Sequence, residues 1–276
     1  MSNSQADFRL RTRFIIKLGR ALHHCGANSV RIEEHLGNVT KMLGLKGSFL
    51  VSPTTFTYIF WEDDEMEQFT HTERMQLSDY DLGSLWEIDR LVESMEGDHL
   101  DLTSALKKLE ELSQSISHYT IWEKCLSCVV TGGAFALLLS PNPLNAVAAA
   151  LVSFALFLIG QLTGSKPGLK AASTIIHAFT AGVLSVALSA TGMALNVPIV
   201  ILASIIINIP GLALTVALEE TSHGHLISGC SRLIDAITTL LKLIFGTLAG
   251  IAVANFFVVP STEPQLALSP LPDLRI

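Results

Sequence analysis

The sequence predicts a membrane α-helical protein in which a cytoplasmic α+β domain precedes five transmembrane helices. The chain of 276 residues is 49% hydrophobic and 16% charged, with a mean hydropathy of +0.47, which is more apolar than a soluble globular chain usually is. Residues 1–123 carry 12 Lys and Arg against 20 Asp and Glu, whereas residues 124–276 carry 6 against 5. We therefore expect a domain over 1–120, membrane helices over 121–259, and a flexible tail over 260–276.

The N-terminal domain is expected to begin with an amphipathic helix. Phe14, Ile15, Leu18 and Leu22 recur at helical spacing, so they form one apolar face. We expect this face to pack on its own domain. The alternative, a helix lying on the membrane surface, is less favoured because no aromatic belt accompanies the face.

Turn and cap residues predict the rest of this domain. Gly26 is expected to end the first helix, Asn28 or Ser29 to cap a second helix running to Met42, and Gly44 to stop it. The stretch "SFLVSPTTFTYIF" has the composition of strands, and "MEQFTHTERM" can return as a paired strand. Two more helices are expected at about 80–95 and 101–117, with these core residues: Trp86, Leu91, Leu106 and Leu109.

No cofactor or metal site is predicted. The acidic turn over 62–67 lacks the Gly and the spacing of a calcium loop, so a solvated hairpin tip is the better interpretation. Cys125 and Cys128 lack the second pair that a zinc site needs, and adjacent residues of "HHC" point about 100° apart on a helix. Neither half of the chain is basic enough for nucleic acid.

Five apolar segments approach the roughly 20 residues that a helix needs to cross the hydrocarbon core. We expect these spans: 121–140, 143–163, 171–191, 198–218 and 235–258. The cations near their ends are Lys124, Lys166, Lys170 and Arg232. Because Lys and Arg stay on the cytoplasmic side of short loops, the N-terminal domain is expected in the cytoplasm and the proline-rich tail outside.

Small residues recur four apart on two of the spans. Gly246, Gly250 and Ala254 do so on the fifth span, and Ala178 and Gly182 on the third. This pattern lets helix backbones approach closely, so these spans are expected to pack on other helices, of this chain or of another copy in a homo-oligomer.

Polar side chains at membrane depth indicate function, since a charge near the bilayer centre costs on the order of 3 kcal/mol. His177 lies on the third span, either as a packing residue or as a proton carrier. Lys242 lies on the fifth span, about 15 Å past Arg232 along a helix. Lys242 either faces a cavity near the midplane or extends to the cytoplasmic interface.

The fourth span is interrupted at its centre by Asn208, Pro210 and Gly211. Proline removes an amide donor and frees a carbonyl on the preceding turn. Broken helices at this depth line polar cavities in transporters, and a half-helix beginning at Gly211 would suit an anionic solute. The alternative is a proline kink healed by neighbouring helices.

Two stretches resemble the signatures of the threonine/serine exporter family. The first is "PGLALTVALEETSHGHLISGCSR", and the second is "LGRALHHCGANSVRIEEHLGNVTKMLGL" followed by "VSPTT". The resemblance covers about residues 10–258. The matching positions are Pro210, Gly211, Glu220, Gly224, Ser228, Gly229 and Arg232 in the first, and Gly26, Ala27, Ser29, Arg31 and Glu33 in the second. The chain departs from the family at Glu220, where Asp is usual.

The resemblance implies the larger subunit of a split, two-chain exporter in a bacterial inner membrane. Its partner would be a small hydrophobic membrane subunit, and its solute serine, threonine or a C4-dicarboxylate such as succinate. Solute would bind near Pro210 and Lys242, with Glu220, His225 and Arg232 at the cytoplasmic mouth. His225 could carry a coupled proton, or Glu220 and Arg232 could be loop charges that neutralise each other.

An enzyme is not expected, because the spans contain no HExxH or GxSxG motif and no paired aspartates. The alternative function is a membrane-anchored sensor or scaffold whose cytoplasmic domain binds a ligand or partner. Transport predicts that substituting Lys242 or Glu220 abolishes efflux, whereas a scaffold predicts no effect.

Overall fold

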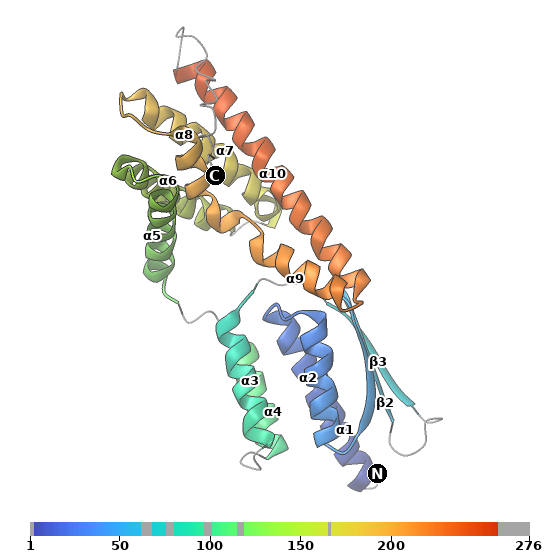
Figure 1. Ribbon diagram of the computed structural model, residues 1–276. Helices are drawn as coiled ribbons and strands as arrows, with labels where there is room; N and C mark the ends of the chain where they lie inside the picture. Colours follow the sequence, from blue (N-terminus) through green and yellow to red (C-terminus); the bar gives the residue numbers. More distant parts are fainter. Residues whose placement is uncertain are drawn as a thin grey trace, which may run out of the picture. The chain divides into compact units, whose positions relative to one another are not determined.

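The computed structural model describes residues 3–61, 68–75, 80–96, 101–114, 119–164 and 167–258 (Figure 1). The chain divides into two compact units. Unit 1 comprises Met1–His118 and Gly211–Ile237, and unit 2 comprises Tyr119–Pro210 and Thr238–Ile276. The domain boundaries expected from the sequence stay a prediction. The acidic turn over 62–67, Lys166 and the tail lie outside the described residues.

Unit 1 is an α+β unit, as the sequence predicts. Its antiparallel sheet has the order β1-β2-β3, formed by β1 (Lys46–Val51), β2 (Thr55–Trp61) and β3 (Gln68–Arg74). Its helices are α1 (Asn3–His24), α2 (Ser29–Met42), α3 (Leu82–Glu96), α4 (Leu102–Gln114), α9 (Gly211–Ser222) and the start of α10 (Leu226–Val258). The stretch "SFLVSPTTFTYIF" forms two strands, because Ser52 and Thr55 bond to each other and turn the chain.

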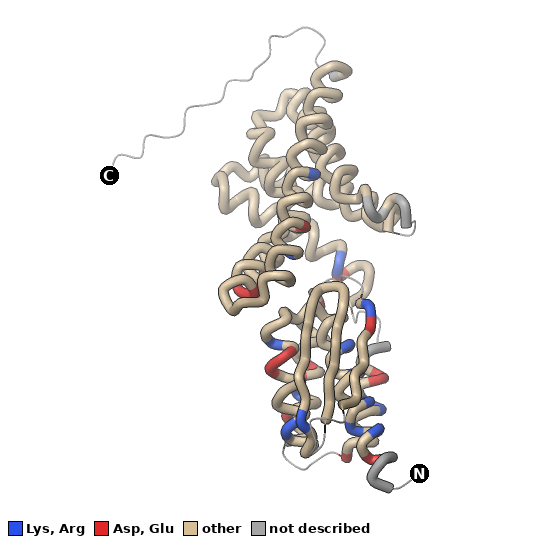
Figure 2. The backbone as a smooth tube through the Cα atoms, turned by 90° about the vertical axis from the view of Figure 1, so that its right-hand side faces the viewer, with Lys and Arg blue, Asp and Glu red and all other residues tan. Residues whose placement is uncertain are grey.

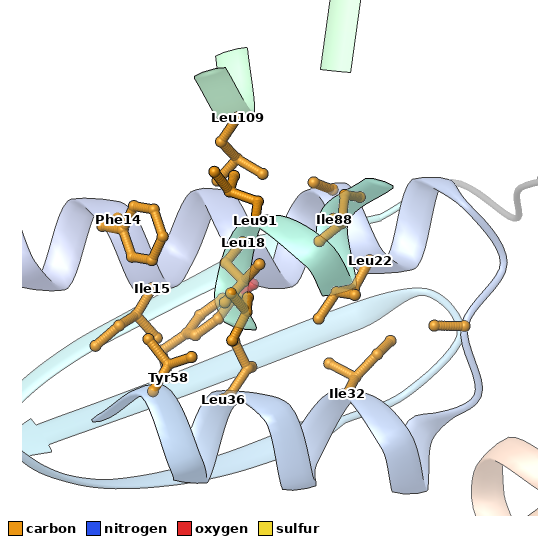
Figure 3. Packing of buried hydrophobic residues seen from close by; sticks show 14 of the residues in the cluster. Phe14, Ile15, Leu18, Leu22, Ile32, Leu36, Tyr58, Ile88, Leu91 and Leu109 are labelled. Atoms are coloured by element: carbon orange, nitrogen blue, oxygen red, sulfur yellow. The ribbon is translucent and has the colours of Figure 1, made fainter. Parts of the chain in front are cut away.

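The core of unit 1 lies around α1. Phe14, Ile15, Leu18 and Leu22 have no exposed surface, and they pack with side chains of α2, α3, α4 and the sheet (Figure 3). Burying one such side chain stabilises the fold by about 1.5–3 kcal/mol. The predicted packing of the first helix on its own domain is confirmed.

The predicted caps of α1 and α2 are confirmed, and one predicted core residue is wrong. Gly26 and Gly44 have positive φ, and the Asn28 side chain accepts the Arg31 N–H at the start of α2. Trp86, however, is 57% exposed. The Arg90 guanidinium lies 4.8 Å from its ring centroid, so a cation–π contact holds this indole at the surface.

Cys25 is a buried thiol that we expect to be chemically inert. Burial, followed by the charges of Asp81 and Asp89, raises the pKa of Cys25 to about 11. Only the thiolate is reactive, so at pH 8 about a thousandth of this thiol is in the reactive form. In a variant whose other cysteines are replaced by serine, we expect maleimide to label Cys25 only after unfolding, as followed by intact mass. Fast labelling of the folded chain would contradict this burial.

Unit 2 is all helical, with α5 (Ile121–Leu139), α6 (Pro143–Gly164), α7 (Pro167–Ala190), α8 (Val197–Ser204), the 3₁₀ turn η1 (Ile206–Asn208) and the remainder of α10. Four described helices are long and apolar enough to cross a membrane, or five if α8 and the bent continuation Ile206–Ser222 form one span. The predicted membrane fold is confirmed. Figure 2 shows that Lys, Arg, Asp and Glu are sparse along these helices.

Helices α7 and α10 pack through glycine, as the small-residue pattern predicts. A Cβ added at Gly182 would lie 2.8 Å from the Thr247 carbonyl oxygen, and one added at Gly250 would lie 2.2 Å from the Phe179 carbonyl oxygen. Real Cβ atoms are essentially never that close to another heavy atom. The two backbones therefore approach to a distance that only glycine permits.

Candidate functional site

The break in the fourth span is present where the sequence predicts it. Helix α8 ends at Ser204, η1 follows, and Ile209 is extended with φ −75° and ψ 122°. Pro210 has no N–H, and α9 begins at Gly211. The break thus places polar side chains between apolar segments of unit 2.

A cavity of about 160 Å³ lies beside this break in unit 2. Its polar lining comes from α5, α6, α7, α8 and η1. The lining residues are Cys128, Ser153, Leu156, Phe157, Gly160, Gln161, His177, Ser204, Ile207 and Asn208. The structure thus brings His177 and Asn208, both predicted from the sequence, to one cavity.

His177 and Asn208 form the polar centre of the cavity. The Nδ1 atom of His177 lies 3.4 Å from Oδ1 of Asn208. Because an amide oxygen can only accept, Nδ1 carries the hydrogen in this pair, and Nε2 is left as an acceptor. Nε2 is buried and has no hydrogen-bond partner among the described residues.

Ser153 adds a second unpaired group. Its hydroxyl is buried and has no partner among the described residues. A Cβ added at Gly132 would lie 2.0 Å from Ser153 Oγ, so α5 needs glycine at this position to make room for the hydroxyl. An unsatisfied buried polar group costs about 1–3 kcal/mol, which a bound polar molecule would recover.

The cavity suits a small molecule without a large net charge. Among the residues that the structure describes, no Asp, Glu, Lys or Arg lines it. An engineered protein cavity of about 150 Å³ holds benzene, and serine and threonine have about as many heavy atoms. Hydroxyl, amide and imidazole groups can bond the ammonium, carboxylate and hydroxyl of such a solute.

Lys242 does not line this cavity. It lies in the middle of α10, a helix that begins at Leu226, before the span expected over 235–258. Its side chain is half-buried, and within the part of the chain that the structure describes no hydrogen bond or ion pair involves it. Its placement near the solute stays a prediction.

The two family-like stretches meet in unit 1 at Glu220. This carboxylate is fully buried, accepts the Ser29 N–H at 2.8 Å and lies 3.1 Å from Arg232 Nε. Arg232 Nε and Glu220 Oε2 are not aligned for a hydrogen bond, so charge holds this pair. Ser29 is the first residue of α2, where the helix dipole favours a negative group.

Further polar contacts surround Glu220. Ser29 Oγ lies 2.9 Å from Ser228 Oγ, and Ser228 Oγ lies 3.3 Å from the Val51 carbonyl oxygen. Arg232 donates to the Tyr80 hydroxyl at 3.3 Å and to the Ala27 carbonyl oxygen at 3.4 Å. The start of α2, the end of β1 and the start of α10 are therefore joined by one hydrogen-bonded network.

His225 and Glu33 extend the network at the turn between α9 and α10. His225 Nδ1 lies 3.6 Å from Glu33 Oε1, which also accepts the Val51 N–H at 3.2 Å. Burial raises the pKa of Glu33, and the Val51 N–H and His225 partly oppose this effect. His225 thus contacts an acidic group of unit 1, and its predicted role at a solute mouth is not tested.

Two glycines of the first stretch have clear structural roles. Gly224 has φ 87°, a conformation that favours glycine, and it ends α9. A Cβ added at Gly229 would lie 2.2 Å from Thr221 Oγ1 and 2.8 Å from the Ala217 carbonyl oxygen. These glycines let α9 and α10 cross closely, which brings Glu220 and Arg232 together.

Sequence reasoning did not assign several residues of these sites, among them Ser29, Glu33 and Ser153. Ser29 and Glu33 stand in a family-like stretch, but nothing local shows that they contact residues about 190 positions later. Ser153 had one usable signal in the sequence, because it is a polar residue within the apolar run 146–160 of its span.

A family model described as "Putative threonine/serine exporter" matches residues 13–254. The chain belongs to the threonine/serine exporter family. That family is one of transporters and not of enzymes.

Fungal relatives of this member of the family are distant. The chain is 24% identical to the pheromone-regulated membrane protein 10 of Candida albicans over 258 residues, which are 90% of the chain and 23% of the relative. It is 23% identical to the protein of that name from Yarrowia lipolytica, covering 90% of the chain and 21% of the relative. An uncharacterized Schizosaccharomyces pombe protein is 30% identical over 117 residues, 42% of the chain and 15% of the relative.

The chain thus spans less than a quarter of the length of these curated relatives. No solved structure matches the chain.

Proposed function

We propose that this exporter-family chain is the larger subunit of a two-chain secondary exporter that moves serine and threonine out of the cytoplasm. The N-terminal domain lies in the cytoplasm, and a small hydrophobic membrane subunit completes the path. The observation that supports this proposal is the cavity at the broken span, where Ser153 and His177 each have an unpaired buried polar atom.

The lining favours a neutral amino acid over a dicarboxylate. Succinate would bring two negative charges to a cavity whose described lining contains no Lys or Arg. An uncompensated buried charge costs several kcal/mol, whereas a zwitterion brings its own compensating charge. Succinate is therefore the comparison solute in any transport assay of this chain.

An apolar groove in unit 2 supports the proposal that a second subunit binds this chain. It has a volume of about 390 Å³ and is lined by α8 and α10, with side chains such as Ile201, Ile205, Leu243 and Leu248. A groove of this chemistry accepts a membrane helix or a lipid chain. Co-purification of the small subunit with the full chain, lost in Leu248→Trp, would support the helix, because Leu248 lines the groove and is exposed.

Solute counterflow tests the site. The full chain and its partner are placed in vesicles loaded with unlabelled serine, and uptake of labelled serine is measured. We expect Ser153→Ala to lower exchange by about 3- to 10-fold, since one neutral hydrogen bond contributes about 0.5–1.5 kcal/mol.

Ser185→Ala is the matched control for this test. Ser185 is also fully buried with an unpaired hydroxyl, but it does not line the cavity. We expect its exchange to match the unmodified protein. Equal rates for Ser153→Ala and the unmodified protein would contradict the cavity as the site. No exchange in the unmodified pair would instead support the scaffold function.

A further inference from the structure

We infer that His177 is the proton-exchange residue of this exporter, because solute and proton compete for the single lone pair on its Nε2 atom. The inference rests on the proposed function and assigns its coupling step to one atom.

The geometry leaves only one basic atom on this imidazole. Asn208 Oδ1 engages Nδ1 at 3.4 Å, so the hydrogen of the neutral ring resides there. Nε2 holds the remaining lone pair, and no described residue donates to it. A lone pair accepts one hydrogen at a time, from a solute ammonium or from water as a proton.

Nε2 is an acceptor buried inside unit 2. Gly160 lies beside the ring, and a Cβ added there would lie 3.4 Å from Nε2. A buried acceptor without a hydrogen-bond partner destabilises the empty site, so binding of either occupant is favoured. Histidine also titrates nearer to physiological pH than any other unperturbed side chain.

The other groups facing the cavity leave His177 as the base. Helix α6 contributes Gly160 and Gln161, and α8 and η1 contribute Ser204 and Asn208, none of which titrates near neutral pH. Cys128 of α5 is the other titratable residue in the described lining. A thiol ordinarily titrates near pH 8.5 and gains a negative charge when it does, so it cannot become a cation that repels an ammonium.

The cycle follows from this competition. A proton arriving from outside forms an N–H bond at Nε2, and the imidazolium can then neither accept from the solute ammonium nor tolerate its charge. The solute leaves to the outside. The Nε2–H bond then breaks to water on the cytoplasmic side, and the lone pair accepts the next solute. One proton enters for each solute exported.

Proton release on binding tests the competition in the unmodified protein. Serine is added to the purified full chain in weak buffer containing a pH dye. Below the pKa of the site we expect about one proton released per serine bound, and an apparent affinity that falls about tenfold for each unit of decreasing pH. Binding without proton release, or with an affinity independent of pH, would overturn the inference.

Two variants separate binding from coupling. His177→Gln retains a hydrogen-bonding group but cannot titrate, so we expect the counterflow that remains to be independent of pH. Serine accumulation driven by a pH gradient should be lost. His223→Gln, the matched control at an exposed histidine that does not line the cavity, should retain both activities.

The outcomes distinguish the two proposals. Gradient-driven accumulation by His177→Gln equal to that of the unmodified protein would overturn the role of His177 while leaving the exporter proposal in place. Failure of the unmodified protein to bind or exchange serine and threonine would overturn the exporter proposal, and this inference with it. If His177→Gln does not fold, the pH dependence of the unmodified protein still decides the question.

Discussion

Replacing Glu220 with alanine is expected to destabilise the chain by about 3–5 kcal/mol, a large part of the about 5–15 kcal/mol that typically stabilises a folded domain. Glu220 is fully buried, and the Arg232 side chain is only 11% exposed. Removing the carboxylate leaves a buried guanidinium without its ion-pair partner and the Ser29 N–H without its acceptor. Thermal unfolding of the purified variant in detergent measures the effect.

Glu219 offers the matched control for this change. It is adjacent in sequence and has the same charge, but it is exposed. We expect Glu219→Ala to change stability by less than about 0.5 kcal/mol. Glu220→Ala combined with Arg232→Met should be more stable than Glu220→Ala alone, because no buried charge is then left unpaired. Equal melting temperatures for the two alanine variants would show that the ion pair contributes nothing.

This expectation changes how transport data at Glu220 should be interpreted. The placement of Glu220 and Arg232 at a solute mouth stays a prediction, and the structure shows that both contact other residues of unit 1. Loss of efflux in Glu220→Ala would follow from misfolding alone. Only a folded variant that binds solute less tightly would support a direct role in the path.

The membrane half could be predicted in large part because lipid restricts the backbone so strongly. A spanning segment must satisfy its own N–H and C=O groups, so a long apolar run becomes a helix. The break was predictable for the converse reason, since Pro210 cannot donate and the helix ends before it. The start of α10 at Leu226 was not predictable from hydropathy, because Arg232 and Asp235 interrupt the apolar run without ending the helix.

The sites depended on contacts that no local pattern records. Ser29 and Glu220 are separated by 191 positions, and their hydrogen bond follows from how unit 1 folds as a whole. Trp86 was predicted to be a core residue, yet its neighbour Arg90 stabilises it at the surface. The cavity could not be predicted from the sequence either, because Ser153 lies against Gly132 of another helix.

Replacing Gly250 with alanine is expected to give the largest loss of stability in the membrane half. The new Cβ would lie 2.2 Å from the Phe179 carbonyl oxygen and 3.0 Å from its carbon, and both are backbone atoms that cannot rotate away. Inserting one methyl group into a packed core costs about 1–3 kcal/mol, and a backbone clash places this change at the upper end. The loss of stability can be measured as a lower temperature at which the variant, heated in detergent, ceases to be monodisperse.

Two other glycines allow the effects of three alanine substitutions on stability to be ranked. A Cβ at Gly246 would lie 2.8 Å from the Ile175 carbonyl oxygen and 2.9 Å from the Ala178 Cβ, which is a less severe clash than the one at Gly250. A Cβ at Gly164 would have no neighbour within 4 Å. We therefore expect Gly250→Ala to destabilise more than Gly246→Ala, and Gly164→Ala to be neutral or slightly stabilising, because alanine is the better helix former. If all three variants melted together, α7 and α10 would not be in contact through these backbones, and the helix pair that carries His177 and Lys242 would have to be arranged differently.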